Sequence, residues 1–183
     1  MPAQQKPGPK AGPVRIAVAA LALSAAGLIG IATKEGYTDR AIIPTKGDRP
    51  TVGFGSTVRE DGSRVQMGDR TDPVRALRTV KAHLDREENQ FRESLAGVAL
   101  TQVEYDVYMD FTYQYGLANW RGSTMRKQLL AGNYAEACDA LLMWRKAGGY
   151  DCSTLVDGRP NKRCWGVWER QLERVAACRA ELQ

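Results

Sequence analysis

The chain has 183 residues, a formal net charge of +5 and a single histidine. Its hydrophobic fraction of 43% and charged fraction of 26% are those of a globular protein, which excludes an intrinsically disordered chain. The positive charge favours an anionic partner such as a nucleic acid, a membrane surface or an acidic wall polymer. No run of lysines and arginines is dense enough for a nucleic-acid-binding stripe, so we expect no nucleic-acid partner.

The first 15 residues form a basic tail that we expect to lack regular structure and to stay on the cytoplasmic side of a membrane. The tail is rich in proline and glycine and carries Lys6, Lys10 and Arg15. An uncharged segment, residues 16–33, follows directly and contains seven alanines. We expect this segment to form an apolar helix.

Three interpretations of residues 16–33 remain open. The first is a cleaved signal peptide, with a small-residue site at Gly30-Ile31-Ala32. The second is a permanent membrane anchor, although the segment is short of the roughly 20 apolar residues that span a bilayer. The third is a segment that inserts and later leaves the membrane, and it fits the composition best because alanine buries little apolar area.

The remaining residues, 34–183, are long enough for one compact domain with a real core. We expect a small β-element first, with strands over residues 51–58 and 64–67. The pair Asp61-Gly62 lies between them and is typical of a hairpin turn.

The rest of the domain is predicted to be helical, beginning with an amphipathic helix over residues 73–95. Thr101 and Glu104 form a capping-box pattern that opens a second helix, which we expect to end at Tyr115, before Gly116. Further helices are expected over residues 124–130 behind Ser123, 134–145 behind Asn133, and 167–182. The predicted fold class is therefore α+β and mainly helical.

The four cysteines all lie in the C-terminal quarter. An even number of cysteines after an export segment indicates two disulfides, for which three pairings exist. We favour Cys152–Cys164, which closes a polar loop over residues 148–162, and Cys138–Cys178, which ties two helices together. Four reduced thiols are the alternative. No Cys-x-x-Cys motif is present, so we expect no metal.

Carboxylates are the best candidates for catalysis, because the sequence contains no serine or cysteine nucleophile motif and no phosphate-binding loop. Glu35 directly follows the apolar segment, and a carboxyl group against apolar surface is favoured in its protonated form. A protonated carboxyl group is what a general acid needs near neutral pH. Glycoside hydrolysis pairs such an acid with a second carboxylate. The alternative for Glu35 is an exposed helix charge.

Several motifs, in their order and spacing, resemble a phage-type lysozyme of glycoside hydrolase family 24, and the resemblance covers about residues 34–178. They are Glu35-Gly36, the run 51–57 that begins Thr-Val-Gly-Phe-Gly, the run 100–106 and the helix end at 113–116. With the alanine-rich segment in front, the chain is similar to a signal-arrest-release endolysin of a tailed phage. The resemblance implies a lysozyme-like fold with a small antiparallel sheet near the catalytic cleft.

The resemblance also implies a catalytic triad of glutamate, aspartate and threonine. Glu35 matches the glutamate and Thr51 matches the threonine. Pro44 occupies the family's aspartate position, so the sequence departs from the pattern there. We assign the aspartate role to Asp48, in a loop one residue longer, with Asp39 as the fallback.

The activity implied is cleavage of the β-1,4 bond between N-acetylmuramic acid and N-acetylglucosamine in peptidoglycan, without a cofactor. Gly53 and Gly55 would let sugar approach the strand backbone, although a bent strand explains them equally well. Tyr105, Tyr113 and Trp120 are candidate sugar-facing walls, with burial in the core as the alternative. We expect a monomer at the host inner membrane, facing the periplasm, that is later released to the periplasm. The alternatives are a non-catalytic wall-binding protein and an unrelated membrane-anchored interaction protein.

Overall fold

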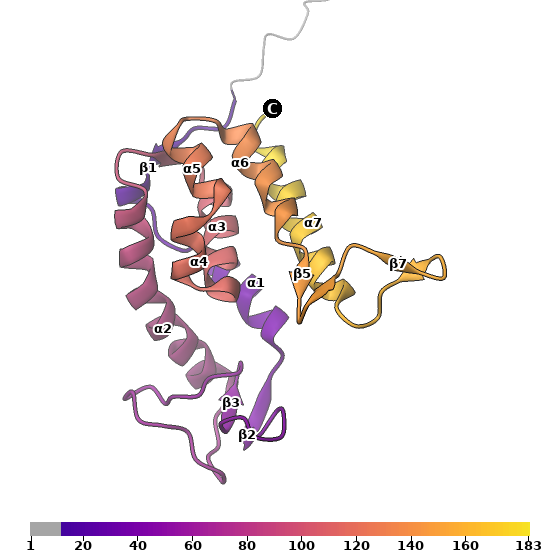
Figure 1. The fold of residues 1–183 in the computed structure, drawn as a ribbon. Coiled ribbons are helices and arrows are strands. Elements are labelled where there is room, and N and C mark those ends of the chain that lie inside the picture. The colour runs from indigo at the N-terminus through magenta and orange to yellow at the C-terminus, as the bar shows by residue number, and fades with distance from the viewer. Residues whose placement is uncertain (1–11) are drawn as a thin grey trace, which may run out of the picture.

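The computed structural model describes residues 12–183, so the expectation for the tail bearing Lys6 and Lys10 lies outside the described residues. Seven α-helices make up nearly half of this part of the chain, and short paired strands accompany them (Figure 1). The helices are α1 (Ala25–Glu35), α2 (Pro73–Ser94), α3 (Gln102–Tyr115), α4 (Leu117–Gly122), α5 (Thr124–Leu130), α6 (Tyr134–Ala140) and α7 (Trp165–Ala180). The strand pairs are β1 (Ile16–Ala17) with β4 (Ala99–Leu100), β2 (Thr38–Ile42) with β3 (Thr51–Gly53), β5 (Lys146–Ala147) with β6 (Tyr150–Asp151) and β7 (Leu155–Val156) with β8 (Arg159–Pro160), all antiparallel.

Residues 16–33 do not form the single apolar helix that we expected. The segment starts as β1, continues as a 3-10 turn at Val18–Ala20, and becomes helical only at α1. Ser24 sets the start of α1 because its hydroxyl accepts a hydrogen bond from the N–H of Gly27. Val18 and Ile31 are buried in the main core. Between residues 12 and 183, no helix combines the length and apolar character needed to cross a membrane.

The core is built around α3, which crosses the centre of the molecule. Its capping box is present as predicted, with Thr101 and Glu104 satisfying each other's backbone N–H groups. Tyr105, Tyr108 and Phe111 of α3 are fully buried and pack with Trp120 and Phe91. The apolar stripe of α2 faces the same core, except that Val74, at the first turn, is exposed. These rings account for much of the apolar area removed from water.

The predicted hairpin over residues 51–58 and 64–67 is mostly absent. β3 ends at Gly53 and pairs with β2, which the sequence did not indicate, and only an isolated bridge joins Val58 to Arg64. The chain from residue 54 to residue 72 is instead an irregular lobe, held by the ion pair between Arg59 and Asp69 at 2.8 Å. Asp69 also accepts a hydrogen bond from the N–H of Gln66.

The C-terminal part contains both disulfides that we favour, Cys138–Cys178 and Cys152–Cys164. The first joins α6 to α7, and the second closes the loop that carries β7 and β8. Helix α6 stops at Ala140 instead of residue 145, and the side chain of Asn133 makes no cap hydrogen bond. A short 3-10 turn, Leu141–Met143, follows α6.

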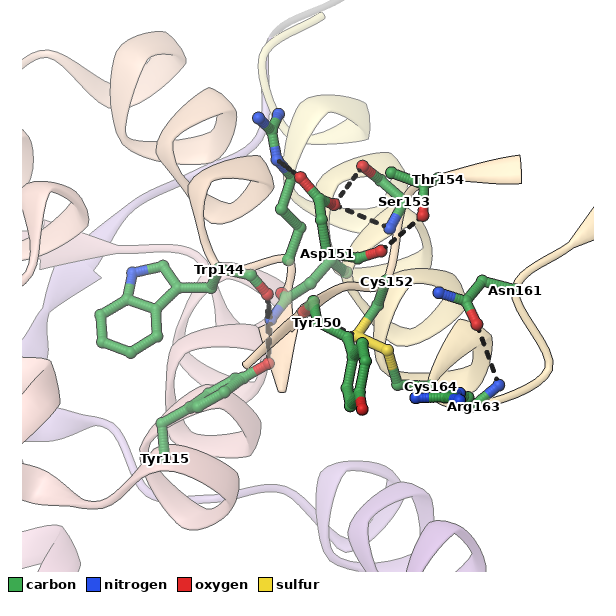
Figure 2. Close-up of a disulfide and its surroundings, with 12 residues drawn as sticks. Tyr115, Trp144, Tyr150, Asp151, Cys152, Ser153, Thr154, Asn161, Arg163 and Cys164 are labelled. Atoms are coloured by element: carbon green, nitrogen blue, oxygen red, sulfur yellow. Dashed lines mark hydrogen bonds and ion pairs between the residues drawn. A yellow bond between two sulfur atoms is a disulfide. The ribbon is translucent and has the colours of Figure 1, made fainter. Parts of the chain in front are cut away.

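Figure 2 shows how the second disulfide is supported. Asp151 accepts hydrogen bonds from the N–H and the hydroxyl of Ser153, and it also pairs with Arg145. Asn161 accepts from the N–H of Arg163, so the strand ends on both sides of the disulfide are fixed. The β7–β8 hairpin projects from the helical body (Figure 1).

Candidate active site

Glu35 is the last residue of α1 and lies where the helical body meets β2 and β3 (Figure 1). Gly36 follows with a φ of +72°, a conformation that L-residues with side chains rarely adopt, and it turns the chain into β2. The Glu-Gly pair therefore has a structural reason: the glycine ends the helix sharply and lets the chain turn into β2.

The neighbour of Glu35 is a cation, not the apolar surface that we expected. Arg170 of α7 donates from Nη1 to Oε1 of Glu35 at 3.3 Å. The same guanidinium donates from Nη2 to Oδ1 of Asp110 at 2.5 Å. Arg174, one turn further along α7, donates from Nε to Asp110 at 2.6 Å. The carboxylate of Glu35 thus belongs to a network of two carboxylates and two guanidiniums that joins α1, α3 and α7.

The network around Asp110 lies largely inside the protein. The side chains of Arg170 and Asp110 are 10% and 13% exposed. Burial raises the pKa of Asp110, but the hydrogen bonds and charges of Arg170 and Arg174 outweigh it and hold that pKa below its ordinary value. Asp110 is therefore ionised throughout the neutral range.

Tyr113 is the aromatic side chain that the structure brings close to Glu35. Burial, and secondarily the negative charge of Glu35, raise the pKa of Tyr113 to about 12. Its hydroxyl stays protonated at neutral pH and is able to donate a hydrogen bond. The ring packs edge-on against His83 of α2, with 6.2 Å between the ring centroids.

A groove of about 410 Å³ opens beside Tyr113, between α2 and the chain that follows β3. The groove is lined by Gly55, Ser56, Thr57, Val58, Thr79, Val80, His83, Arg86, Glu87 and Tyr113. Hydroxyl, imidazole, carboxylate and guanidinium groups all face this space, which suits a polar, hydroxyl-rich ligand such as a sugar. Among residues 12–183, no cluster of three or more His, Cys, Asp or Glu side chains is placed to hold a metal ion.

Asp48 and Thr51 lie at the opposite end of β2 from Glu35. Thr51 pairs with Ile42, whereas the Glu35 end of the hairpin pairs Thr38 with Gly53. Thr51 and Gly53 are two residues apart on β3, which is about 7 Å, whereas the irregular β2 uses four residues over the same stretch. Asp48 is exposed in the connecting loop. In the described part of the chain, no hydrogen bond or ion pair links the side chains of Glu35, Asp48 and Thr51.

Asp39, the fallback for the aspartate role, lies on β2 itself. Its side chain is 68% exposed, and it forms an ion pair with the adjacent Arg40 at 3.8 Å. Asp39 is four residues from Glu35 along the chain and so lies on the Glu35 half of the hairpin. Both aspartates are accessible to a substrate, and their roles stay a prediction.

The two glycines that we expected beside the sugar have different surroundings. A Cβ atom on Gly53 would lie 2.7 Å from the Cβ of Ala76, so this glycine allows β3 to pack tightly against α2. A Cβ atom on Gly55 would meet no atom within 4 Å. Gly55 lines the groove and has a φ of +77° in the turn that bridges Val52 to Ser56. Gly53 is explained by the fold, and Gly55 faces open space.

Tyr105 and Trp120 do not face a ligand. Tyr105 is fully buried and donates its hydroxyl hydrogen to Glu88 at 2.7 Å. Trp120 is fully buried and donates from Nε1 to the hydroxyl of Ser94 at 2.9 Å. The prediction of sugar-facing walls was wrong for both, because each ring fills the core and its polar atom already has a buried partner.

The sequence analysis did not single out Asp110, Arg170, Arg174 or His83. The spacing of Arg170 and Arg174 places both side chains on one face of α7, and two cations on a face otherwise lined by core residues are a signal for a buried carboxylate. Nothing in the spacing identifies that carboxylate, since Asp110 lies 60 positions from Arg170 and 64 from Arg174 along the chain.

Comparison with known proteins gives a consistent result. The family model described as phage lysozyme matches residues 32–162. The endolysin of Salmonella phage P22 is 32% identical over 141 residues, which cover 77% of this chain and 94% of that protein. The SAR-endolysin of Bacteriophage PS119 is 34% identical over 61 residues, covering 33% of this chain and 36% of that protein. The solved structure of the endolysin from Escherichia coli O157:H7 phage FAHEc1 gives a TM-score of 0.71 at 26% identity, covering 87% of this chain and 94% of that chain. The fold is accordingly the lysozyme-like α+β fold.

Proposed function

Since the chain belongs to the phage lysozyme family, we propose that it is an endolysin that cleaves the β-1,4 bond between N-acetylmuramic acid and N-acetylglucosamine in peptidoglycan. The observation that carries this proposal is Glu35, a partly exposed carboxylate at the end of α1 whose negative charge acts on the uncharged Tyr113 at the groove. Cleavage of the wall by this activity would lyse the host cell at the end of a phage cycle.

In the proposed mechanism, Glu35 protonates the glycosidic oxygen as the bond breaks. Thr51 and an aspartate, Asp48 or Asp39, position water on the other face of the sugar ring. The groove beside Tyr113 holds the glycan strand, and the cation Arg86 in its lining suits the anionic stem peptides of the wall. General acid catalysis of this kind contributes roughly 10²–10⁴-fold to a rate.

The decisive experiment compares the chain with its Glu35→Gln variant on purified Gram-negative peptidoglycan. Glutamine keeps the size and hydrogen-bonding capacity of the side chain but has no proton to donate to a leaving oxygen. We expect loss of wall clearing with the fold intact by circular dichroism. Glu136→Gln, at an exposed site on α6, is the matched control and should keep full activity. Near-normal clearing by Glu35→Gln would rule out the glycosidase mechanism.

We further propose that residues 16–33 first hold the protein in the inner membrane, facing the periplasm, and later leave the bilayer to dock on the domain. The alanine-rich composition supports this proposal because such a segment is held weakly. A relative matched over a third of this chain is a SAR-endolysin. Replacing Ala19, Ala22, Gly27 and Gly30 with leucine should trap the protein in the membrane and block lysis, whereas an active form starting at residue 33 would indicate cleavage instead.

A non-catalytic wall-binding protein is the second candidate. Pro44 stands where the family carries its aspartate, and Asp48 lies on an exposed loop without a side-chain partner in the described residues. Binding to peptidoglycan without release of reducing ends by the unmodified chain would favour this candidate.

A further inference from the structure

Arg170 is shared unequally between two carboxylates. Its contact with Asp110 is short, at 2.5 Å, and a second bond from Nε reaches the other oxygen of Asp110 at 3.3 Å. The remaining nitrogen, Nη1, lies 3.3 Å from Glu35. Asp110 therefore fixes the plane of the guanidinium with a two-pronged contact, and the orientation of Nη1 toward Glu35 follows from that contact.

We propose that Asp110 is a positioning residue for the glycosidase reaction: through Arg170 it orients the carboxyl group of Glu35, and it offsets part of the positive charge next to that group. Asp110 does not touch the groove and acts only through Arg170. The inference rests on the proposed function, in which Glu35 is the general acid.

The charges around Glu35 can be counted from each element packed there. α7 contributes Arg170 and, behind it, Arg174. α3 contributes Asp110 and the neutral Tyr113, and Glu87 of α2 acts on Tyr113 from further away. Lys34 of α1 is already paired with Glu173 at 2.7 Å.

Glu35 contacts Arg170, and Arg170 shares Asp110 with Arg174, so the groups linked to Glu35 carry a net charge of 2 − 1 = +1. Without the carboxylate of Asp110 the net charge becomes +2. A larger positive charge favours the ionised form of Glu35, which has no proton to give.

A purely structural role for Asp110 is the competing explanation. Arg174 donates to both the side chain and the backbone carbonyl of Asp110, at 2.6 and 3.0 Å, so Asp110 also ties α3 to α7. Loss of that tie alone would lower stability and the amount of folded enzyme, and it would leave the shape of the pH–activity profile unchanged. The pH profile therefore separates the two roles.

The test measures release of reducing ends from purified peptidoglycan between about pH 4 and pH 9, a range that spans carboxyl and imidazole titration. In Asp110→Asn, the alkaline limb of the profile should move to lower pH by about one unit, the effect of an uncompensated arginine. The maximal rate should fall by up to about 100-fold, as expected for a misplaced catalytic group. Arg170→Gln removes the cation and should move the same limb in the opposite direction, to higher pH.

The matched control is Asp139→Asn, which breaks the exposed pair between Asp139 and Arg179 on α6 and α7 and should leave the profile unchanged. An unshifted limb in folded Asp110→Asn overturns the inference. If Asp110→Asn does not fold, Arg170→Gln decides: a limb at higher pH supports the inference and an unshifted limb overturns it. If the unmodified chain releases no reducing ends, or Glu35→Gln still releases them, the proposed function fails and the inference falls with it.

Discussion

Arg15 donates two hydrogen bonds to Glu104, one to each carboxylate oxygen, at 3.0 and 2.6 Å. Glu104 is only 1% exposed and also accepts the N–H of Thr101 in the capping box of α3. The residue that precedes the alanine-rich segment is therefore anchored on the helix at the centre of the core. Because the contact joins residues 89 positions apart, it closes the N-terminal segment onto the domain.

The first prediction concerns this anchor. Glu104→Gln keeps an oxygen for the N–H of Thr101 but loses the charge that binds Arg15. A hydrogen bond to a charged group contributes about 2 kcal/mol, so the free energy of unfolding should fall by about that amount. Urea unfolding measures it. Glu136→Gln, at an exposed site, is the control, and equal stability of the two variants would contradict the anchor.

The second prediction concerns the rest of residues 16–33, which form hydrogen bonds to polar side chains of the domain. Asp106 accepts hydrogen bonds from the N–H and the hydroxyl of Ser24, and Glu88 accepts the N–H of Leu23 at 2.6 Å. Asp106→Ala removes both bonds to Ser24, the cap of α1. Limited proteolysis of this variant should then cut residues 12–24 faster than in the unmodified chain. Cleavage at an unchanged rate would mean that apolar packing alone holds the segment.

The third prediction separates Asp48 from Asp39. If Asp48 fills the aspartate role, Asp48→Asn should lose most wall-clearing activity and Asp39→Asn should keep it. Asp48 precedes Thr51 by only three residues along the chain, which favours this outcome. The two variants carry the same chemical change on one hairpin and so control for each other. The reverse pattern would assign the role to Asp39.

The helices of this protein are predictable because their signals are local. The sequence predicts α2 and α3 to within one residue at each end, since Asp72 and Thr101 cap the helices from adjacent positions. Helix α6 is shorter than predicted because Trp144 turns inward, where its ring packs against Phe111 and Tyr115. That packing depends on residues nearly 30 positions away, and no local pattern reveals it.

In the candidate site, too, local features are predictable from the sequence and contacts from distant helices are not. The motif at Glu35 predicts a general acid there, because the helix end and the glycine that follows are local features. The surroundings of Glu35 are not predictable, because Arg170 and Asp110 arrive from other helices. Tyr105 illustrates the opposite error, since an aromatic residue on a helix gives no sign of whether it faces the core or a ligand.

The fourth prediction concerns the pH dependence of stability at Asp110. Its pKa is lower in the folded chain than the unfolded value of about 3.9, so its contribution is present above that value and is lost as pH falls through the folded value. Removing one partner of a buried ion pair costs about 3 kcal/mol. Asp110→Asn should therefore be destabilised by about that amount near neutral pH.

The same reasoning requires that the two proteins differ less in their free energy of unfolding in acid, because Asp110 and the asparagine that replaces it are then both uncharged. Thermal unfolding at a series of pH values measures this difference. Asp139→Asn, whose pair is exposed, should differ little from the unmodified chain at any pH. A constant deficit for Asp110→Asn across the acid range would show that the charge of Asp110 is not what stabilises the helices.

The fifth prediction concerns the two disulfides. Intact mass without reductant should show four protons missing relative to the reduced chain. The bond Cys138–Cys178 joins residues 40 positions apart and Cys152–Cys164 joins residues 12 apart. Chain-entropy arguments give about 4 kcal/mol for the longer loop and about 3 kcal/mol for the shorter one.

Cys138 and Cys178 are also fully buried between α6 and α7, so serines there would place hydroxyls in the core. The paired replacement Cys138→Ser and Cys178→Ser should therefore lower the free energy of unfolding more than Cys152→Ser with Cys164→Ser. Urea unfolding of both double variants is the measurement. The opposite ranking would mean that the oxidised chain gains more stability from the closed loop with β7 and β8 than from the link between α6 and α7.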